Sequence, residues 1–525
     1  MISPLNTFDF LVRAAKLYPE RIAVVDGNKR FTYAELKNRS IALNGAVRAS
    51  GLSQGDVVSV LDYNTHHMLE LYYALTKTGI VINPLNFRYS VEELAYMINH
   101  VKSKTIFVHQ DFLPLFEKMK ERLKSVQQVV LIEKSDPVDR KYRFYEELIK
   151  EAKTHLVSKP VDENGVAEIL FTSGSSDKPK AVGLTHRNLY LNALYTIIAY
   201  TMTEDDTLLH VVPLFHANGG GTPQTITAVG GRHVMLRKVD AETMLRLIDH
   251  ESVTMFVAVP TVLNRFLSHS DFKSFNTSSL RRIIIVGTAA SVDLMREIES
   301  KIPNCECLSA YGMTEAGPLV ALAKPKSEDR GLPAPDRLKL RTRTGYEVLG
   351  VQVKLDAGGN NPGPREGEIL IKGNSIFNGY YDNHHATSEA IIDGWFRTGD
   401  WGREYDGGWI VVIDRAKDMI KSGGENISST EVEQILTKHP AIAEAAVIPI
   451  PNKEWGEVPK AFVVLKPGTN TSETEILDYC RSNMAHFKAP KSIEFLDLLP
   501  RTVTGKVAKS DLRRKYWSDR ERQIN

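Results

Sequence analysis

Short apolar runs rich in β-branched residues alternate with amphipathic helical runs along most of this 525-residue chain. The strand-like runs include 57–61, 105–108, 129–132, 167–171, 255–259 and 283–286, and helical spacing marks 68–75 and 243–249. Parallel strands need long crossover connections, which are usually helices, so this alternation predicts an α/β protein with largely parallel sheets. A chain of this length exceeds one hydrophobic core and accommodates two or three domains.

The pattern changes between about residues 346 and 409, where short strand-like runs are separated by turns rich in Gly, Pro and Asn. Such a pattern predicts a smaller β-rich subdomain. A charged stretch at 414–418 and a turn-forming segment at 422–426 follow, and they mark a domain boundary near Asp414.

Beyond this boundary the pattern predicts a helix at 431–436, strands at 445–448 and 461–465, and a helix from about Ser472. We therefore expect a large N-terminal domain over 1–414, built of αβ-layered sheets plus the β-rich subdomain. A small C-terminal α+β domain is expected over 415–525.

Charge and composition exclude several functional classes. The net charge of +2 gives no global field that would attract nucleic acid or an anionic membrane. No apolar run approaches the roughly 18 residues of a membrane span, and the N-terminus lacks the apolar core of a signal peptide. The cysteines Cys305, Cys307 and Cys480 are too few for a disulfide framework and suit a reducing compartment. We expect a cytoplasmic enzyme.

A small basic loop, Phe171-Thr-Ser-Gly-Ser-Ser-Asp-Lys-Pro-Lys180, lies between two apolar runs. Hydroxyls, a glycine that exposes backbone N–H groups, and lysines together suit the binding of polyphosphate. The Walker A pattern does not fit the loop, and by itself it could be an ordinary polar hairpin. Thr185 is expected to cap the helix that follows the next strand.

Six further motifs stand in order along the chain. They are Pro213-Leu-Phe-His-Ala-Asn218, Tyr311-Gly-Met-Thr-Glu-Ala-Gly317, Trp395-Phe-Arg-Thr-Gly-Asp400, Asp414-Arg-Ala-Lys-Asp-Met-Ile420, Lys421-Ser-Gly-Gly-Glu-Asn426 and Pro500-Arg-Thr-Val-Thr-Gly-Lys506. With the loop, they resemble in order and approximate spacing the motifs of the AMP-forming acyl-CoA synthetases, members of the adenylate-forming superfamily. The resemblance extends over nearly the whole chain. It implies ATP, Mg²⁺ and coenzyme A as cofactors and a small carboxylic acid as substrate.

The resemblance assigns roles at the nucleotide site. Thr172, Ser173, Gly174, Ser175, Ser176 and Lys180 would hold the leaving pyrophosphate. Glu315 would ligate Mg²⁺, a hard cation suited to a carboxylate, and Thr314 would contact the α-phosphate. Tyr311 would stack on adenine, Asp400 would accept the ribose hydroxyls, and Arg415 would complete the ribose and phosphate contacts. Taken alone, Asp400 would be an ordinary turn aspartate.

Lys506 would bridge the carboxylate and the α-phosphate during adenylation, by the same resemblance. The C-terminal domain would then rotate about a hinge at Lys417. After rotation, Lys421, Gly423 and Gly424 would line the tunnel for the pantetheine arm, where glycine lets the backbone approach a thin ligand closely.

The acid pocket would be formed by His216, Gly287, Met313 and Leu319, with His216 as a gate toward the nucleotide and Gly287 shared with the nucleotide site. These residues are mostly small or apolar, which favours an uncharged acyl group. No acidic residue is placed to hold a substrate amine. An aromatic, alicyclic or short-to-medium-chain fatty acid is therefore expected.

One residue departs from the family pattern. Asp177 stands where the family usually has glycine, and it adds a negative charge beside phosphates. Three alternatives stay open: an adenylating enzyme that loads a carrier protein, a luciferase-like oxygenase, and a non-catalytic nucleotide-binding protein. The sequence fits a monomer or a homodimer.

Overall fold

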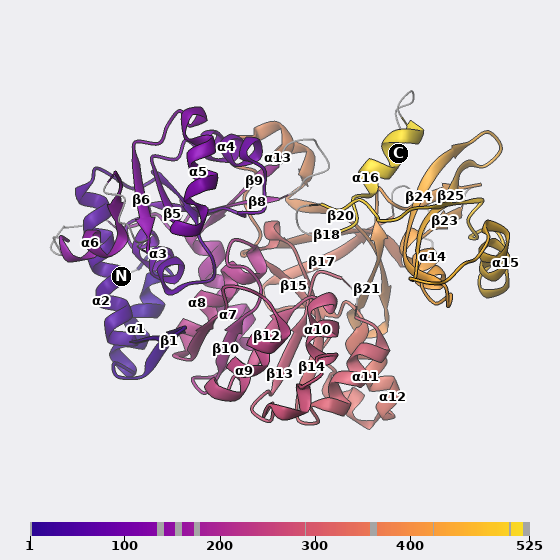
Figure 1. Ribbon diagram of the computed structural model, residues 1–525, viewed down its shortest axis with the longest axis horizontal. Helices are drawn as coiled ribbons and strands as arrows, with labels where there is room; N and C mark the ends of the chain where they lie inside the picture. Colours follow the sequence, from indigo (N-terminus) through magenta and orange to yellow (C-terminus); the bar gives the residue numbers. More distant parts are fainter. Residues whose placement is uncertain are drawn as a thin grey trace. The chain divides into compact units, whose positions relative to one another are not determined.

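The computed structural model describes residues 3–133, 141–152, 160–172, 179–288, 290–357, 365–423, 425–502 and 506–517. The chain divides into two compact units (Figure 1). The first comprises residues 1–353 and 371–396, and the second comprises 354–370 and 397–525.

Two large sheets form the first unit. The seven-stranded sheet has the order β7 (Arg143–Phe144), β6 (Gln128–Ile132), β5 (Thr105–His109), β3 (Val57–Leu61), β4 (Val81–Pro84), β8 (Val166–Thr172), β9 (Lys180–Thr185). The nine-stranded sheet has the order β16 (Tyr346–Glu347), β15 (Leu319–Leu322), β14 (Glu306–Gly312), β13 (Arg282–Ile285), β12 (Met255–Ala258), β10 (Thr207–His210), β11 (Arg232–Met235), β1 (Ile22–Asp26), β2 (Lys29–Thr32).

Neighbouring strands within both large sheets are mostly parallel, and antiparallel pairs occur toward the sheet edges, as for β8 with β9 and β14 with β15. The helices described in the first unit are α1 (Phe8–Leu17), α2 (Tyr33–Ala49), α3 (His66–Thr76), α4 (Val91–His100), α5 (Leu113–Met119), α6 (Tyr145–Lys150), α7 (His186–Tyr200), α8 (Ala217–Val229), α9 (Ala241–Glu251), α10 (Pro260–Leu267), α11 (Val292–Lys301), α12 (Ala334–Thr342) and α13 (His384–Ala390). The predicted α/β alternation with largely parallel sheets is confirmed.

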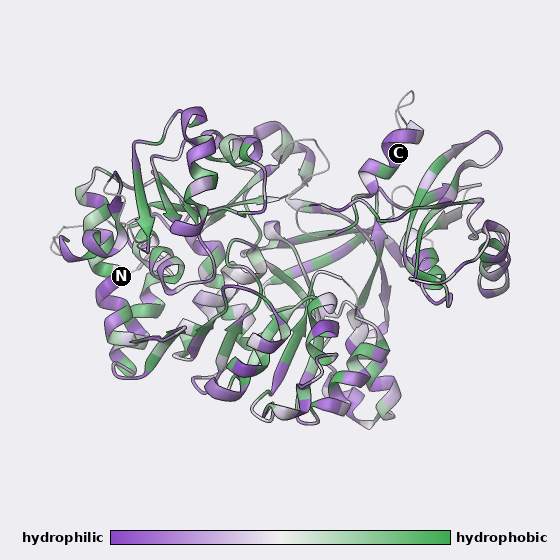
Figure 2. Cartoon of the chain, viewed as in Figure 1, coloured by the Kyte–Doolittle hydropathy of each residue, from purple (hydrophilic) through white to green (hydrophobic). Residues whose placement is uncertain are grey.

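Each large sheet has its own hydrophobic core, and the strands at the centre of each are the most hydrophobic parts of the ribbon (Figure 2). Helix α7 contacts strands of both sheets, including β9 and β15. It begins where predicted, because the Thr185 side chain accepts a hydrogen bond from the Asn188 N–H in a reciprocal capping arrangement. This capped helix therefore joins the two halves of the first unit.

The second unit contains most of one small sheet and the whole of another. The first has the order β17 (Val351–Asp356), β18 (Glu366–Gly373), β20 (Trp395–Tyr405), β19 (Ile391–Ile392), and β21 (Trp409–Arg415) pairs with β20. The second has the order β23 (Glu425–Ile427), β22 (Ile420–Ser422), β25 (Gly456–Leu465), β24 (Ile442–Asn452), and β26 (Ser492–Phe495) pairs with β25. Its helices are α14 (Ser429–Leu436), α15 (Glu473–Asn483) and α16 (Lys509–Trp517).

The β-rich segment and the small C-terminal α+β domain therefore exist as predicted. Residues of β22 and β25 pack with α14 and α15 around a core of their own. The mobility of this domain and its boundary after residue 414 stay predictions.

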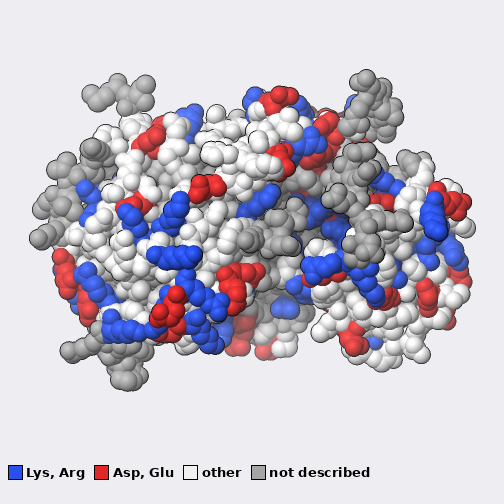
Figure 3. Space-filling model, turned by 90° about the horizontal axis from the view of Figure 1, so that it is seen from above, with Lys and Arg blue, Asp and Glu red and all other residues white. Residues whose placement is uncertain are grey.

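No helix within the described ranges is long and apolar enough to cross a membrane. Figure 3 shows basic and acidic side chains interspersed over the face that it draws. This mixture agrees with the nearly balanced charge of the sequence.

An arginine connects three helices of the first unit. The Arg39 Nε of α2 donates to the Glu70 Oε1 of α3 at 2.6 Å, and its Nη2 donates to the Glu146 Oε1 of α6, also at 2.6 Å. Glu70 is fully buried and also accepts from the Tyr145 hydroxyl at 2.7 Å. Removing one partner of a buried ion pair leaves an uncompensated charge, which costs more than the pair itself contributes.

Arg39→Met should therefore destabilise the first unit by roughly 3–5 kcal/mol, measured as a lower midpoint in urea unfolding. The exposed pair Arg122–Glu92 provides the control, because Arg122→Ala should change stability by less than about 1 kcal/mol. Equal effects of the two substitutions would contradict the stabilising role of Arg39.

Glu168 is a fully buried acid in β8, close to the predicted phosphate loop. Burial raises its pKa to about 8, an effect that the Tyr72 hydroxyl 3.2 Å from its Oε1 partly offsets. The unfolded chain releases this proton near pH 4.5, whereas the folded chain retains it until about pH 8. Ionisation therefore favours unfolding as the pH rises through this window.

Glu168→Gln should remove this contribution. The gain in stability of the variant over the wild type should be larger at pH 8.5 than at pH 5.5, as measured by thermal unfolding of both proteins at both pH values. Glu121→Gln, at an exposed position, is the control. A stability difference that is the same at both pH values would rule out a neutral Glu168 in the folded protein.

Candidate active site

The two ends of the predicted phosphate loop meet in an antiparallel hairpin. Thr172, at the end of β8, is paired with Lys180, at the start of β9. Ser173, Gly174, Ser175, Ser176 and Asp177 lie outside the described residues. The hairpin places Lys180 so that its Nζ is 4.9 Å from the centroid of the Tyr380 ring, a cation–π distance.

A tight turn at the end of β14 presents Thr314 and Glu315. The Met313 N–H donates to the Pro318 carbonyl at 3.0 Å, and a 3-10 turn covers Thr314–Ala316. Gly317 follows with a φ of +78°, and a Cβ at this position would lie 2.6 Å from the Ser375 carbonyl oxygen. Only glycine allows the turn to pack so closely on the segment 374–381.

Glu315 is tied to that segment by its backbone and its side chain. Its carbonyl accepts from the Phe377 N–H at 2.8 Å, and its Oε1 accepts from the Tyr380 hydroxyl at 3.2 Å. Burial and the neighbouring carboxylate raise the pKa of Tyr380, so its hydroxyl remains a donor. Tyr380 therefore contacts both Glu315 and Lys180, two residues that the sequence predicted for the same site.

Tyr380 was not predicted from the sequence. Its available signal was the pair Tyr380-Tyr381 directly after the turn-forming Asn378-Gly379. Tyr380 also forms a bridge with Val182 of β9, and the Tyr381 N–H donates to the Ala181 carbonyl at 2.8 Å.

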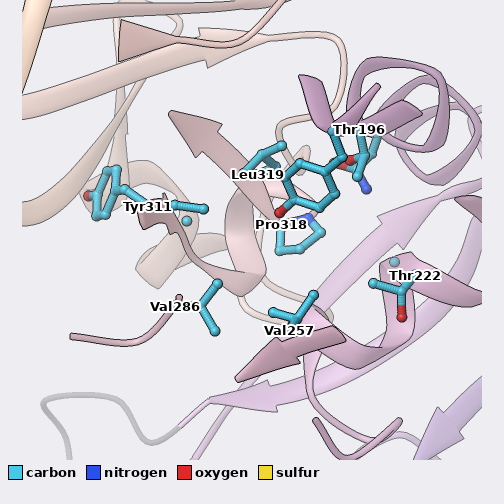
Figure 4. A pocket seen from close by; sticks show the side chains of 12 residues that line it. Thr196, Thr222, Val257, Val286, Tyr311, Pro318 and Leu319 are labelled. Atoms are coloured by element: carbon cyan, nitrogen blue, oxygen red, sulfur yellow. The ribbon is translucent and has the colours of Figure 1, made fainter. Parts of the chain in front are cut away.

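A pocket opens beside this turn. Its lining residues are Asn192, Thr196, Tyr200, Gly221, Thr222, Val257, Val286, Ala310, Tyr311, Gly312, Pro318 and Leu319. Counting its open part, the pocket contains about 380 Å³ of empty space. Figure 4 shows Val257 and Val286 along one side of it, with Leu319 and Pro318 opposite.

Among the residues predicted for the acid pocket, Leu319 lines this space, as does Tyr311, which was predicted for adenine. Gly287 and Met313 directly follow the lining residues Val286 and Gly312. His216 lies at the N-cap of α8, the helix that contributes Gly221 and Thr222 to the lining. Of the residues predicted for the acid, Leu319 alone is a lining residue of this pocket, and the contact of all four with an acid stays a prediction.

In the second unit, strand pairing brings two predicted nucleotide residues together. Asp400 of β20 is the register partner of Arg415 of β21, and the Arg415 Nε lies 2.9 Å from the Asp400 Oδ1. Asp400 is buried, whereas Arg415 is exposed to solvent. The Asp400 N–H donates to the Thr398 hydroxyl at 3.1 Å, which fixes the backbone at this point of the strand.

Lys506 belongs to the same electrostatic environment. Although its side chain reaches solvent, partial burial and the Arg415 charge lower its pKa, whereas Asp400 raises it. Lys506 is therefore within electrostatic range of both Asp400 and Arg415, which the strand pairing brings together.

The predicted hinge residue Lys417 lies in a turn after β21. Burial lowers the pKa of its side chain. Its carbonyl accepts from Nη1 of Arg513 in α16 at 3.2 Å, and Arg513 also pairs with Asp418. Any rotation about Lys417 would therefore have to carry α16 along or break these contacts.

The segment predicted for the pantetheine arm has a structural reason for its glycine. Gly423 comes directly after β22, the strand that contains Lys421. It has a φ of +60°, and a Cβ there would lie 2.7 Å from Cε3 of Trp455. Packing against Trp455 thus requires glycine irrespective of any ligand. Gly424 lies outside the described residues.

In the described part of the chain, one group of side chains has metal-ligand spacing: His66, His67 and Glu146. Both Glu146 oxygens, however, accept hydrogen bonds from Arg39. A cation would have to displace this guanidinium, so the group does not fit a metal. The carboxylate of Glu315 has the hard oxygen donors that Mg²⁺ prefers.

Comparison with known proteins identifies the family. The model of the AMP-binding enzymes matches residues 11–381, and the model of the AMP-binding enzyme C-terminal domain matches 431–506. A butyrate–CoA ligase and a benzoate–CoA ligase of Arabidopsis thaliana, both named as peroxisomal, are each 34% identical to this chain, covering 97% of it and 93% of their own lengths.

A solved structure, an anthranilate–CoA ligase in complex with anthranoyl-AMP, superposes with a TM-score of 0.86 at 25% identity, covering 98% of both chains. The predicted resemblance to the AMP-forming acyl-CoA synthetases is therefore confirmed. The chain belongs to the family of AMP-binding enzymes.

Proposed function

We propose that this protein is an ATP-dependent carboxylic acid–CoA ligase. The observation that carries the proposal is the end of β14, where Tyr311 lines an apolar pocket and the following turn presents Thr314 and Glu315. An acid in that pocket would have its carboxylate close to phosphate groups bound at the turn. The names of the relatives support CoA as the acceptor.

The reaction has two steps. A carboxylate oxygen of the acid attacks the α-phosphorus of ATP, and the bond to pyrophosphate breaks to leave acyl-AMP. The thiol sulfur of CoA then attacks the acyl carbon, and AMP leaves. The first step brings two anions together, so charge neutralisation dominates its catalysis.

The proposed residue roles follow that need. Lys180 and the loop from Thr172 bind pyrophosphate, Glu315 holds Mg²⁺, and Thr314 contacts the α-phosphate. Asp400 and Arg415 bind the ribose, which their pairing in the second unit supports. Glu315 would hold Mg²⁺ where the ion would supply positive charge to the phosphates.

The small domain acts in both steps. Lys417 serves as its hinge, Lys506 acts in adenylation, and Lys421 with Gly423 and Gly424 approaches the pantetheine arm. We propose a mobile C-terminal domain from residue 415, a monomer or homodimer, and a cytoplasmic location. The acid is aromatic, alicyclic or a short-to-medium-chain fatty acid.

The proposal is tested by mass spectrometry of purified protein with Mg-ATP and a panel of benzoic, cyclohexanecarboxylic, cinnamic and C4–C10 fatty acids, with and without CoA. Acyl-CoA formed with an equal amount of AMP supports it. Acyl-AMP without thioester, despite added CoA, would favour a carrier protein as acceptor. If neither the wild type nor Asp177→Gly forms acyl-AMP or acyl-CoA, the result would count against the proposal.

Lys506→Ala should lower the rate of acyl-AMP formation by on the order of 100-fold or more, because a positive charge between two anions is lost. Thioester formation from supplied acyl-AMP should remain close to that of the wild type. The exposed Lys515→Ala, on α16, is the control. Equal loss in both half-reactions would contradict the role of Lys506.

Tyr380→Phe removes the hydrogen bond to Glu315 and keeps the ring beneath Lys180. We expect the Mg²⁺ concentration for half-maximal adenylation to rise by roughly 10- to 150-fold, the range of one hydrogen bond to a charged group. Tyr381→Phe is the matched control. The proposed positioning of Glu315 would be refuted by an unchanged Mg²⁺ dependence.

A further inference from the structure

Three side chains of α7 line the same side of the pocket. Asn192, Thr196 and Tyr200 recur at intervals of four residues, so they lie on one face of the helix. Most of the remaining lining comes from Val257, Val286, Ala310, Pro318 and Leu319. Apart from the side chains of α7, Thr222 and the Tyr311 hydroxyl, the side chains that line the pocket are apolar.

Two of these α7 side chains have polar atoms without partners. Asn192 is 2% exposed and Thr196 is 5% exposed, and among the described residues neither the Asn192 Oδ1 nor the Thr196 Oγ1 has a hydrogen-bond partner. A helical threonine commonly donates to the carbonyl four residues earlier, but Thr196 does not. Buried polar atoms are normally satisfied, so two unsatisfied atoms beside one pocket require an explanation.

No lining residue carries a charge, since the lining contains no Asp, Glu, Lys, Arg or His. Burial raises the pKa of Tyr200, so its hydroxyl stays neutral as well. A charged group at this position would be desolvated without a counter-charge. A neutral group that both donates and accepts hydrogen bonds fits better.

The position of Thr196 indicates which end of a ligand it would meet. In Figure 4, Tyr311 and Thr196 lie toward opposite ends of the pocket, with Leu319, Val286 and Val257 between them. Tyr311 is on the strand that leads to Thr314 and Glu315, so its end faces the reacting groups. The Thr196 end is remote from them.

Space at this remote end depends on Gly221 of α8. A Cβ at this position would lie 2.9 Å from Cδ of Pro318 and 3.1 Å from Nδ2 of Asn192. Glycine therefore leaves the Asn192 amide room beside the pocket. The same absence of a side chain keeps the α8 side of the pocket open.

We propose that Asn192 and Thr196 select a carboxylic acid with an apolar body and a neutral hydroxyl at the end remote from its carboxylate. The hydroxyl donates to the Asn192 Oδ1 and accepts from the Thr196 hydroxyl. This inference rests on the proposed function, because it takes the pocket as the acid site. It makes the two residues determinants of substrate choice.

The test compares acids that differ only in this hydroxyl: 4-hydroxybenzoate with benzoate, 4-hydroxycinnamate with cinnamate, and 6-hydroxyhexanoate with hexanoate. Binding is measured by calorimetry with the corresponding acyl sulfamoyl adenosines, which need no turnover. For at least one pair, the wild type should bind the hydroxylated analogue at least tenfold more tightly. In Thr196→Val and Asn192→Leu this preference should fall to about threefold or less.

Thr196→Val keeps the shape of the side chain, and its melting temperature without ligand should equal or exceed that of the wild type, because an unsatisfied hydroxyl is removed. Ile198→Ala, at an exposed position of α7, is the control and should retain the preference.

Equal affinities within every pair, tighter binding of the unsubstituted analogues, or no binding of any hydroxylated analogue overturns the inference. The outcome is separate from that of the proposed function. Analogue binding with the expected preference but no acyl-CoA in the mass-spectrometric panel, extended by the three hydroxylated acids, would refute ligase activity and leave the specificity intact. Acyl-CoA formation without a hydroxyl preference would support the ligase activity and refute the specificity.

Discussion

The candidate site of the first unit depends on the hydrogen bonds that the segment 374–381 makes. Asn188, in the first turn of α7, donates through its Nδ2 to the carbonyls of Asn374 and Ile376. Phe377 and Tyr381 donate from their backbones to Glu315 and Ala181. One irregular segment thus holds the helix that lines the pocket, the turn that presents Glu315, and the hairpin that carries Lys180.

Because each of these contacts uses a backbone group of the segment, they depend little on the segment's own side chains except where space is limiting. Gly317 is such a place, since any Cβ there would strike the Ser375 carbonyl. In the second unit, strand register has the same role, placing Arg415 opposite Asp400. Both units therefore build their candidate sites by fixing polar side chains on rigid backbone pairings.

Several features of the site were predictable because the residues follow one another in the chain. The loop between β8 and β9, the Thr185 cap and the turn after β14 are local, and each has a local signal in its glycines, hydroxyls and strand patterns. Tyr380 was missed because its partners are distant in sequence, and Asn192 and Thr196 because the pocket that they border is formed by segments far apart in the chain. Gly423 was assigned to a ligand, whereas its packing against Trp455 became visible only in three dimensions.

The sequence by itself determined the α/β class, the order of the elements and the family, because periodicity and motif order are properties of neighbouring residues. Tertiary structure alone decided that Tyr380 links Glu315 with Lys180, and that two unsatisfied polar atoms of α7 border an apolar pocket. These features arise from contacts between segments far apart in the chain. Whether a buried polar atom has a partner depends on how the elements pack, which no local pattern encodes.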